Sequence, residues 1–384
     1  MQNKELMLYL HVPFCARKCH YCDFLSGVHS SETISRYVDA IRREIRERGK
    51  EYSGRSVTSI FFGGGTPSLL SHAQVCAILE TVRSVFYLRD DAEITMECNP
   101  GTATAENLSG YRRAGVNRLS IGLQSAKEEE LRLLGRIHDF PAFLETYRMA
   151  RKAGFQNVSV DLMNALPGQT PGSWKETLES VLSLVPAPEH VSVYSLIVEE
   201  GTRFYDWEKE GKFTGRLALP SEDEDREMYA YTGRRLREAG LLQYEISNYA
   251  RPGMQCRHNF GYWTRKEYLG LGPGAASLLG EVRYLNETEL SKYLEDPLAG
   301  RSAQPLSKKD QMEEFLFLGL RTTRGVKRKE FRECFGEEMD GLWKAVIGKN
   351  VADGLLEDDG EGIRLTARGM DLGNYVSAQF LLEE

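Results

Sequence analysis

Three cysteines lie within eight residues near the N-terminus, whereas the other four cysteines of the chain are far apart. The clustered ones are Cys15, Cys19 and Cys22, separated by three and then two residues. The apolar run 8–12, stopped by a proline, predicts a short strand, so the cysteines are expected on the loop that follows it. This spacing fits a [4Fe–4S] cluster held at three irons, with the fourth iron open to a non-protein ligand.

A zinc site is the alternative for the same cysteines. Structural zinc takes four ligands, and His11 or His20 would supply the fourth. A cluster of small buried thiols without a metal is a further alternative. Disulfides are not expected, because a chain without an export signal keeps its thiols reduced.

Short apolar segments alternate with helical patterns over the first half of the chain, which predicts parallel β/α units. Counting the strand before the cysteines, six such units are expected. Six is too few to close an eight-stranded barrel, so we expect an α/β fold with an open partial (β/α)6 barrel. The further strands are expected at 59–62, 93–98, 118–121, 158–162 and 191–196, with helices that include 74–86 and 173–184.

Glycines and polar side chains recur at the carboxyl ends of these strands, where such a sheet binds ligands. The run 63–67 is Gly-Gly-Gly-Thr-Pro, Glu97 ends the third strand, Gln124 follows the fourth and Asp161 ends the fifth. Each has a structural alternative, since glycines make tight turns and strand-end acids cap helices. Their occurrence on one rim together with the cysteine loop predicts a functional site.

The second half of the chain is less regular. Ser221 and Glu224 form a capping box that opens a helix running to residue 240, and a polar linker is expected near 297–305. We therefore expect a first domain over 1–300 and a small C-terminal domain over 301–384. In the latter, a capping box at Ser307 and Asp310, further helices and a hairpin near 355–365 predict a winged-helix-like fold.

Charge and hydropathy exclude several classes of protein. The 49 basic and 56 acidic residues give a net charge of −7, which argues against general nucleic-acid binding. Residues 304–384 alone hold 12 basic and 16 acidic residues, so the winged-helix-like part is expected to be a lid or docking domain. No apolar run of 18 residues or signal-like start is present, so we expect a cytoplasmic protein without a membrane span.

The motif Tyr9-x-His11-x-Pro13-Phe14-Cys15-x-x-x-Cys19-x-x-Cys22 resembles the radical S-adenosylmethionine (SAM) superfamily. Within it, the chain is similar to the branch that contains anaerobic coproporphyrinogen III dehydrogenase and the heme chaperones called HemW. The resemblance extends over nearly the whole chain and includes the stretches 97–100, 122–125 and 166–169.

The resemblance implies that the three thiolates hold the [4Fe–4S] cluster and that SAM chelates the open iron, where an electron breaks its C–S bond. It also implies that Tyr9 borders cluster and SAM. Glycines let a ligand approach the backbone, a carboxylate accepts from a diol, and an arginine offsets a carboxylate. The implied SAM contacts are Gly64, Gly65 and Thr66 at the methionine part, Glu97 at the ribose, and Gln124, Arg136 and Asp161 around them. For Arg136 the alternative is a surface ion pair.

Departures from the dehydrogenase pattern favour the HemW side of this branch. The dehydrogenase has a further cysteine where this chain has Phe24, a longer N-terminal extension, and a different sequence at the segment 263–266. We therefore expect a heme chaperone that passes heme to a client hemoprotein and works with an electron donor. The alternatives are oxygen-independent coproporphyrinogen III dehydrogenase and a related radical SAM methyltransferase.

The stretch His258-Asn259-x-x-Tyr262-Trp263 is similar to a motif typical of the heme chaperones. A neutral imidazole ligates heme iron, and aromatic neighbours pack against a flat macrocycle, so His258 is expected as a heme contact or axial ligand. The alternative, a histidine held in a polar network, stays open.

Overall fold

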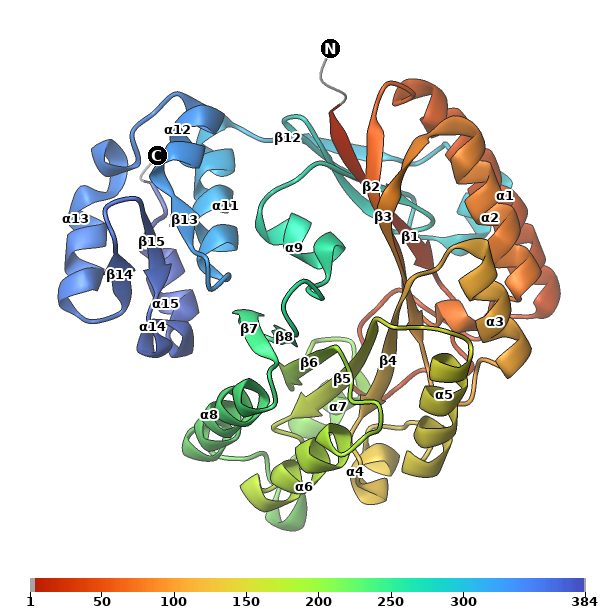
Figure 1. The fold of residues 1–384 in the computed structure, drawn as a ribbon, viewed down its shortest axis with the longest axis horizontal. Helices are drawn as coiled ribbons and strands as arrows, with labels where there is room; N and C mark the ends of the chain where they lie inside the picture. Colours follow the sequence, from red (N-terminus) through yellow and green to blue (C-terminus); the bar gives the residue numbers. More distant parts are fainter. Residues whose placement is uncertain (1–3, 383–384) are drawn as a thin grey trace.

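The computed structural model describes residues 4–382, and a twelve-stranded sheet dominates it (Figure 1). Six parallel strands in chain order form the middle of this sheet, and the sheet order has two ends, as predicted for an open (β/α)6 barrel. The strands are β1 (Glu5–Val12), β2 (Ser56–Gly64), β3 (Tyr87–Cys98), β4 (Arg118–Gln124), β5 (Val158–Asn164) and β6 (His190–Ser195).

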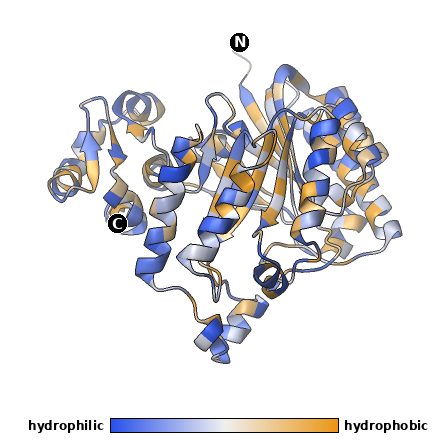
Figure 2. Ribbon diagram, turned by 60° about the horizontal axis from the view of Figure 1, so that its bottom comes forward, coloured by the Kyte–Doolittle hydropathy of each residue, from blue (hydrophilic) through white to orange (hydrophobic). Residues whose placement is uncertain are grey.

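Helices cover the convex face of these strands (Figure 1). They are α1 (Ser31–Glu51), α2 (His72–Val85), α3 (Ala105–Ala114), α4 (Glu128–Leu133), α5 (Phe140–Lys152) and α6 (Pro171–Leu182). In α1 the Ser30 side chain caps the first turn, and Tyr37, Ile41 and Ile45 are buried on one face, in line with their helical spacing. In Figure 2 the strands are mostly hydrophobic and the helices are mixed, which is the pattern of strands buried on both faces.

Short strands extend the sheet at both edges, and the sequence patterns did not predict them. β9 (Tyr268–Leu271) pairs parallel with β1 and is followed by β10 (Ala276–Leu279), β11 (Val282–Leu285) and β12 (Ser302–Pro305). At the other edge lie β8 (Asn248–Ala250) and β7 (Leu242–Glu245). The polar segment 297–305 is therefore not only a linker, because its last four residues pair with β11 as an edge strand. Such short strands contain too few residues to produce a recognisable alternation.

The remaining elements of the large part are 3-10 turns and helices that lie between or after the parallel strands in the chain. They are α7 (Arg203–Lys209), η1 (Pro67–Leu69), η2 (Gly215–Leu217), α8 (Glu222–Glu238), α9 (Arg257–Trp263) and α10 (Leu290–Glu295). The capping box predicted at Ser221 and Glu224 is confirmed at the start of α8. Figure 1 shows α9 inside the curve of the sheet, between the strands and the C-terminal part.

The C-terminal part has its own buried core, which extends from Met312 to Phe380. Its sheet order is β13-β15-β14, with helices around it, as the winged-helix-like prediction requires. Ser307 and Asp310 form the predicted capping box at its first helix. The placement of the domain boundary at residue 300 stays a prediction. The elements are α11 (Lys308–Leu320), β13 (Val326–Lys327), α12 (Arg328–Phe335), α13 (Met339–Ala352), β14 (Leu356–Asp358), β15 (Gly362–Leu365), α14 (Ala367–Asp371) and α15 (Gly373–Ala378).

Polar contacts join this C-terminal part to the sheet and to α9. Thr322 forms an isolated bridge with Glu245, and Glu314 pairs with Arg265 and Arg283. Arg321 lies over the ring of Trp263 at 4.4 Å. Within the range 4–382, no helix has the length and apolar character needed to cross a bilayer.

Candidate functional site

A cavity of about 310 Å³ opens at the carboxyl ends of the parallel strands. Every residue that we predicted for the site lines this cavity, except Tyr9 and His258. The residues brought together are Cys15, Cys19, Cys22, Gly64, Gly65, Thr66, Glu97, Gln124, Arg136 and Asp161. They come from the β1 loop and the ends of β2, β3, β4 and β5, and from the segment after α4, so the parallel arrangement of the strands is what collects them.

The cysteine loop is held by backbone contacts at both ends. The Cys15 amide donates to Gly27 O at 2.9 Å, and the His20 amide donates to Leu134 O at 2.9 Å. Two side-chain donors approach the sulfurs: Thr66 Oγ1 lies 3.6 Å from Cys15 Sγ, and an Arg136 nitrogen lies 3.6 Å from Cys19 Sγ. Hydrogen bonds of this kind stabilise thiolates and tune iron–sulfur clusters.

The two histidines of the zinc alternative are engaged elsewhere. His11 Nε2 donates to Leu25 O at 2.8 Å, so its Nδ1 accepts from the Tyr9 hydroxyl at 3.1 Å. His20 Nδ1 bonds Leu133 O at 2.9 Å. In the part of the chain that the structure describes, no three His, Cys, Asp or Glu side chains are grouped as ligands of one ion. A cubane cluster has a different requirement, since each thiolate binds its own iron.

The glycine run after β2 lies directly against the cysteine loop. Gly64 has φ +109°, a conformation that favours glycine, and a Cβ on Gly65 would lie 2.5 Å from Phe14 O. The Gly65 amide donates to Val12 O, and the Thr66 amide donates to Phe14 O. Only glycine therefore allows strand β2 and the cysteine loop to come this close beside the cavity.

Two acids, Glu97 near the end of β3 and Asp161 on β5, line the cavity; Asp161 lies in the middle of its strand rather than at the expected strand end, because β5 continues to Asn164. Glu97 accepts from the Gly64 amide at 3.2 Å, and burial, with the charge of Asp161 next, raises its pKa to about 8. Asp161 Oδ1 accepts from Ser120 and Ser159 at 3.0 and 2.9 Å, and burial raises its pKa as well. Shifts of this kind are typical of functional sites, where a buried carboxyl awaits a polar or cationic ligand.

Arg136 is not a surface ion pair. Its guanidinium donates to Asn99 Oδ1 and Gly122 O, both at 2.7 Å, and its buried Nε has no partner among the described residues. Gln124, at the end of the neighbouring strand, has φ +70°, which is rare for a residue other than glycine. Backbone strain of this type concentrates at functional sites.

His258 lies below the cavity rather than in its wall. It is fully buried, and both ring nitrogens are bonded, Nδ1 with Ser59 Oγ at 2.9 Å and Nε2 with the Tyr262 hydroxyl at 2.8 Å. Burial, with the charge of Arg118 next, lowers its pKa to about 3, so the ring is neutral. This arrangement favours the alternative of a histidine held in a polar network, because neither nitrogen is free for an iron.

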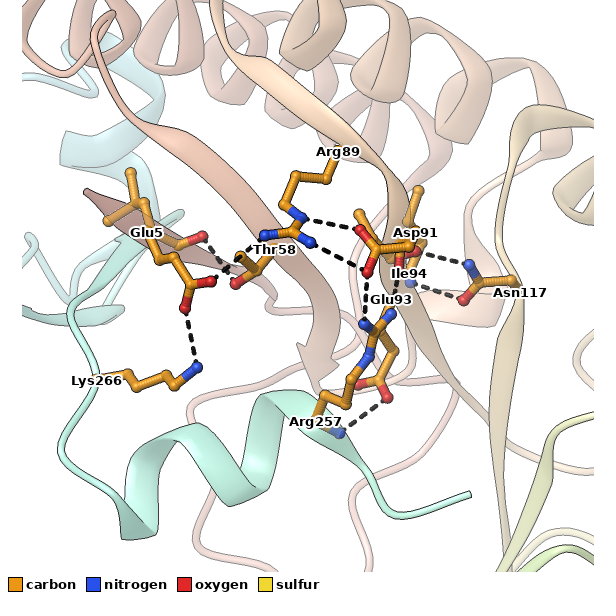
Figure 3. Close-up of polar contacts among 11 residues, drawn as sticks. Glu5, Thr58, Arg89, Asp91, Glu93, Ile94, Asn117, Arg257 and Lys266 are labelled. Carbon is orange, nitrogen blue, oxygen red and sulfur yellow. Dashed lines mark hydrogen bonds and ion pairs between the residues drawn. The ribbon is translucent and has the colours of Figure 1, made fainter. Parts of the chain in front are cut away.

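Helix α9, which carries His258, is fastened to β3 by Glu93. The two carboxylate oxygens accept from the backbone amides of Arg257 and His258 at 2.9 and 3.1 Å. Figure 3 shows the polar contacts around this junction, in which Arg257 also reaches Asp91. The next residue of the helix, Asn259, lines the cavity, so α9 forms its floor.

The sequence reasoning missed several cavity residues on the inward faces of the strands. They are Arg118, Ser120, Ser192 and Tyr194. The signal was present in β4, where Arg118 and Ser120 alternate with the buried Leu119 and Ile121. A charged residue within a strand that is buried on both sides is rare without a partner or a ligand.

Comparison with known proteins agrees with the fold and the site. The family model described as "Radical SAM superfamily" matches residues 9–181, and "HemN C-terminal domain" matches residues 306–372. The solved structure of coproporphyrinogen III oxidase (HemN) from Escherichia coli, a radical SAM enzyme, superposes with a TM-score of 0.84 at 26% identity, covering 99% of this chain and 90% of that one. Fold and site together define a radical SAM protein with a HemN-type C-terminal domain.

Full-length relatives narrow this class. The chain is 37% identical to "Heme chaperone HemW" of Bacillus subtilis over 98% of its own length and 99% of the relative. It is 35% identical to the Escherichia coli protein of the same name over 98% of both chains. A mitochondrial "Radical S-adenosyl methionine domain-containing protein 1" of Mus musculus is 37% identical over 94% of this chain and 84% of the relative. The chain belongs to the HemW family of radical SAM proteins.

Membership in this family implies a [4Fe–4S] cluster and SAM as cofactors, and the cavity has the features that such cofactors need. The three thiols share one loop at its edge, and Gly64 and Gly65, packed against His11 and Phe14, bring the end of β2 beside that loop. When bound, the cluster supplies an electron to the sulfonium of SAM.

Proposed function

We propose that Cys15, Cys19 and Cys22 bind the [4Fe–4S] cluster and that SAM occupies the cavity beside it. In this assignment Gly64, Gly65 and Thr66 receive the methionine part of SAM at the strand β2 end. Glu97 accepts from the ribose hydroxyls, with Gln124, Arg136 and Asp161 around it. Tyr9 does not line the cavity and contributes indirectly, because its hydroxyl donates to Nδ1 of His11, next to the cysteine loop.

We propose further that the protein is a heme chaperone, which binds heme and delivers it to hemoproteins. The observation that carries this proposal is the similarity over the full length of both chains to relatives named heme chaperone HemW. Phe24 supports it from this chain's own residues, since an exposed aromatic ring, 57% accessible at the cavity mouth, suits a flat apolar ligand.

Heme binding by the anaerobically reconstituted protein tests this proposal. Addition of heme should produce a saturable Soret band at one heme per chain. With SAM and a reductant present, heme should then pass from this protein to an added apo-hemoprotein such as apomyoglobin. The transfer should be faster than transfer of heme from serum albumin to the same apo-hemoprotein. Failure to bind heme at micromolar concentration contradicts the proposal.

A second function is favoured by the structural similarity to coproporphyrinogen III oxidase, with its TM-score of 0.84. Under that alternative, the same reconstituted protein converts coproporphyrinogen III to protoporphyrinogen IX over many turnovers. Chromatography of the oxidised porphyrins separates the two outcomes, and S-adenosylhomocysteine in the same samples would indicate a methyltransferase instead.

The partners follow from this proposal. They are heme or a related porphyrin, a client hemoprotein and an electron donor for the cluster, and nucleic acid is not among them. We place this activity in the cytoplasm, where a reducing environment preserves the three thiols for cluster assembly.

A further inference from the structure

Arg118 occupies an unusual position at the floor of the cavity. It lies on β4 opposite Thr95 of β3, its side chain lines the cavity, and it is only 1% exposed. Its Nε is buried and has no hydrogen-bond partner among the described residues. A buried guanidinium with unused donors is costly unless an anion binds it.

The acidic side chains near Arg118 do not accept hydrogen bonds from its guanidinium. Asp161 accepts from two serines, and Glu93 accepts from the first amides of α9. Glu97 has a pKa raised to about 8 by burial, so it is mostly protonated at neutral pH. The neighbouring carboxylates thus offset part of the charge of Arg118 without a direct hydrogen bond. The N–H donors of its guanidinium stay available to a ligand.

We propose that Arg118 binds a carboxylate group of a tetrapyrrole, whose side chain enters the cavity while the macrocycle stays at the mouth. This inference rests on the proposed binding of heme and adds the site that orients it. Guanidinium and carboxylate match in a bidentate pair, and the propionate groups of heme supply that carboxylate.

The shape of the cavity supports this orientation. Its volume of about 310 Å³ is at the lower end for small-molecule sites, too small for SAM and a complete macrocycle together. Two aromatic residues of its lining, Phe24 and Tyr194, are 57% and 41% exposed and so present ring surface at the open side. Asn259 and Ser192 line the same cavity as Arg118 and provide further hydrogen-bonding groups for a carboxylate.

The carboxylate of SAM is the other source of the same chemistry. It belongs near the cysteine loop in the assignment above, whereas Arg118 lies at the other end of strand β4 from Gln124. The experiment below therefore measures heme and SAM separately.

Binding of hemin and of hemin dimethyl ester should be compared in the reconstituted full-length protein. Wild type should bind the ester at least tenfold more weakly, the size expected for one charge-assisted hydrogen bond. Arg118→Met should bind hemin as weakly as the ester, with no discrimination between the two. Arg118→Lys, which keeps the charge but not the fork, should fall between them and serves if the Met variant does not fold.

Arg151→Met is the matched control, because Arg151 is also largely buried, with 11% side-chain exposure, but pairs with Glu189 away from the cavity. It should retain the preference for free propionates. Equal binding of hemin and ester by wild type overturns the inference while leaving heme binding intact. An Arg118 variant that loses SAM but keeps the hemin preference also overturns it, and absence of hemin binding in wild type refutes the proposed function itself.

Discussion

Two glutamates on the inner face of strand β3 have different roles: one stabilises the fold, and the other is available to bind a ligand. Glu93 and Glu97 are four residues apart on β3 and both face inward. Glu93 is closed off, since the amides of Arg257 and His258 and the thiol of Cys256 all donate to it. Glu97 accepts only from the Gly64 amide among the described residues and borders the cavity.

The difference lies in which neighbours arrive from elsewhere in the chain. Helix α9 brings its first amides to Glu93 and thereby becomes the floor of the site, whereas the end of β2 leaves Glu97 open toward a ligand. A carboxylate with a full set of donors stabilises the fold, and one without them is available to bind. We therefore expect changes in the floor to affect stability and changes at the strand ends to affect cofactors.

Loss of a cluster ligand should have the largest effect. Cys19→Ala should remove the [4Fe–4S] cluster, because a cubane held by two thiolates is not retained. The measurement is iron and sulfide content after anaerobic reconstitution, about four of each per chain in wild type, together with visible absorption. Cys334→Ala is the control, since Cys334 is exposed on α12 and distant from the loop, and it should keep the full cluster. A cluster that survives in Cys19→Ala would disprove the ligand assignment.

Removal of the Glu93 carboxylate, which holds helix α9 at the floor of the cavity, should have the next largest effect, a loss of stability. Glu93→Ala leaves the amides of Arg257 and His258 buried without an acceptor, which should lower the apparent free energy of unfolding by about 3 kcal/mol. Urea denaturation followed by tryptophan fluorescence measures this loss. Glu5→Gln removes a surface carboxylate that pairs with Lys266 and Arg89, and should change stability by less than about 1 kcal/mol. Equal losses in the two variants would contradict the comparison.

The corresponding change at the strand end should affect SAM binding instead. Glu97→Gln should weaken SAM affinity about tenfold, equivalent to about 1.4 kcal/mol, because the amide replaces one of the two carboxyl oxygens that face the ribose diol with an NH2 donor, while cluster content is retained. Isothermal titration under anaerobic conditions measures it. Since Glu97 borders the cavity and the amide carries no titratable proton, the same variant should need at least the wild-type urea concentration to unfold. A large loss of stability would show that Glu97 is a second structural clamp.

The remaining prediction concerns the pH dependence of stability. The pKa of Glu97 is about 8 in the folded protein because burial disfavours the charged form, against an ordinary value of 4.5. The folded state thus holds a proton that the unfolded state releases, so this contribution is complete below pH 4.5 and is lost as pH rises through about 8. Wild type should lose stability over this window more steeply than Glu97→Gln, as thermal unfolding at several pH values would record. Parallel curves would indicate that Glu97 titrates normally.

Much of this molecule was predictable from local pattern. The spacing of Cys15, Cys19 and Cys22 predicted an iron–sulfur loop, with zinc as the alternative, and the glycine run and the acid at the end of β3 predicted the rim of the site. Parallel strands bring their carboxyl ends to one edge, so sequence position along each strand translated directly into position in space. The capping boxes at Ser221 and Ser307 likewise marked helix starts without further information.

Other features depended on contacts between distant segments. The pairing of β9 with β1 joins residues more than two hundred positions apart and has no local signal, because each partner is a short apolar run. For His258 the sequence left two interpretations open, a heme contact or a histidine in a polar network, and only the structure shows both nitrogens bonded to Ser59 and Tyr262. No motif records which neighbours a side chain meets.

The sequence by itself thus determined the chemical groups and the rim on which they gather, since strand periodicity and motif spacing are local properties. Only the tertiary structure decided which of these groups are already satisfied and which are free to bind. Glu93 and Glu97 are the same residue type on one strand. Arg118 is a charged residue in a largely apolar strand, and the cavity that it lines accounts for its presence there. Their different roles arise from packing, because the free energy of a buried polar group depends on its partners rather than on its identity.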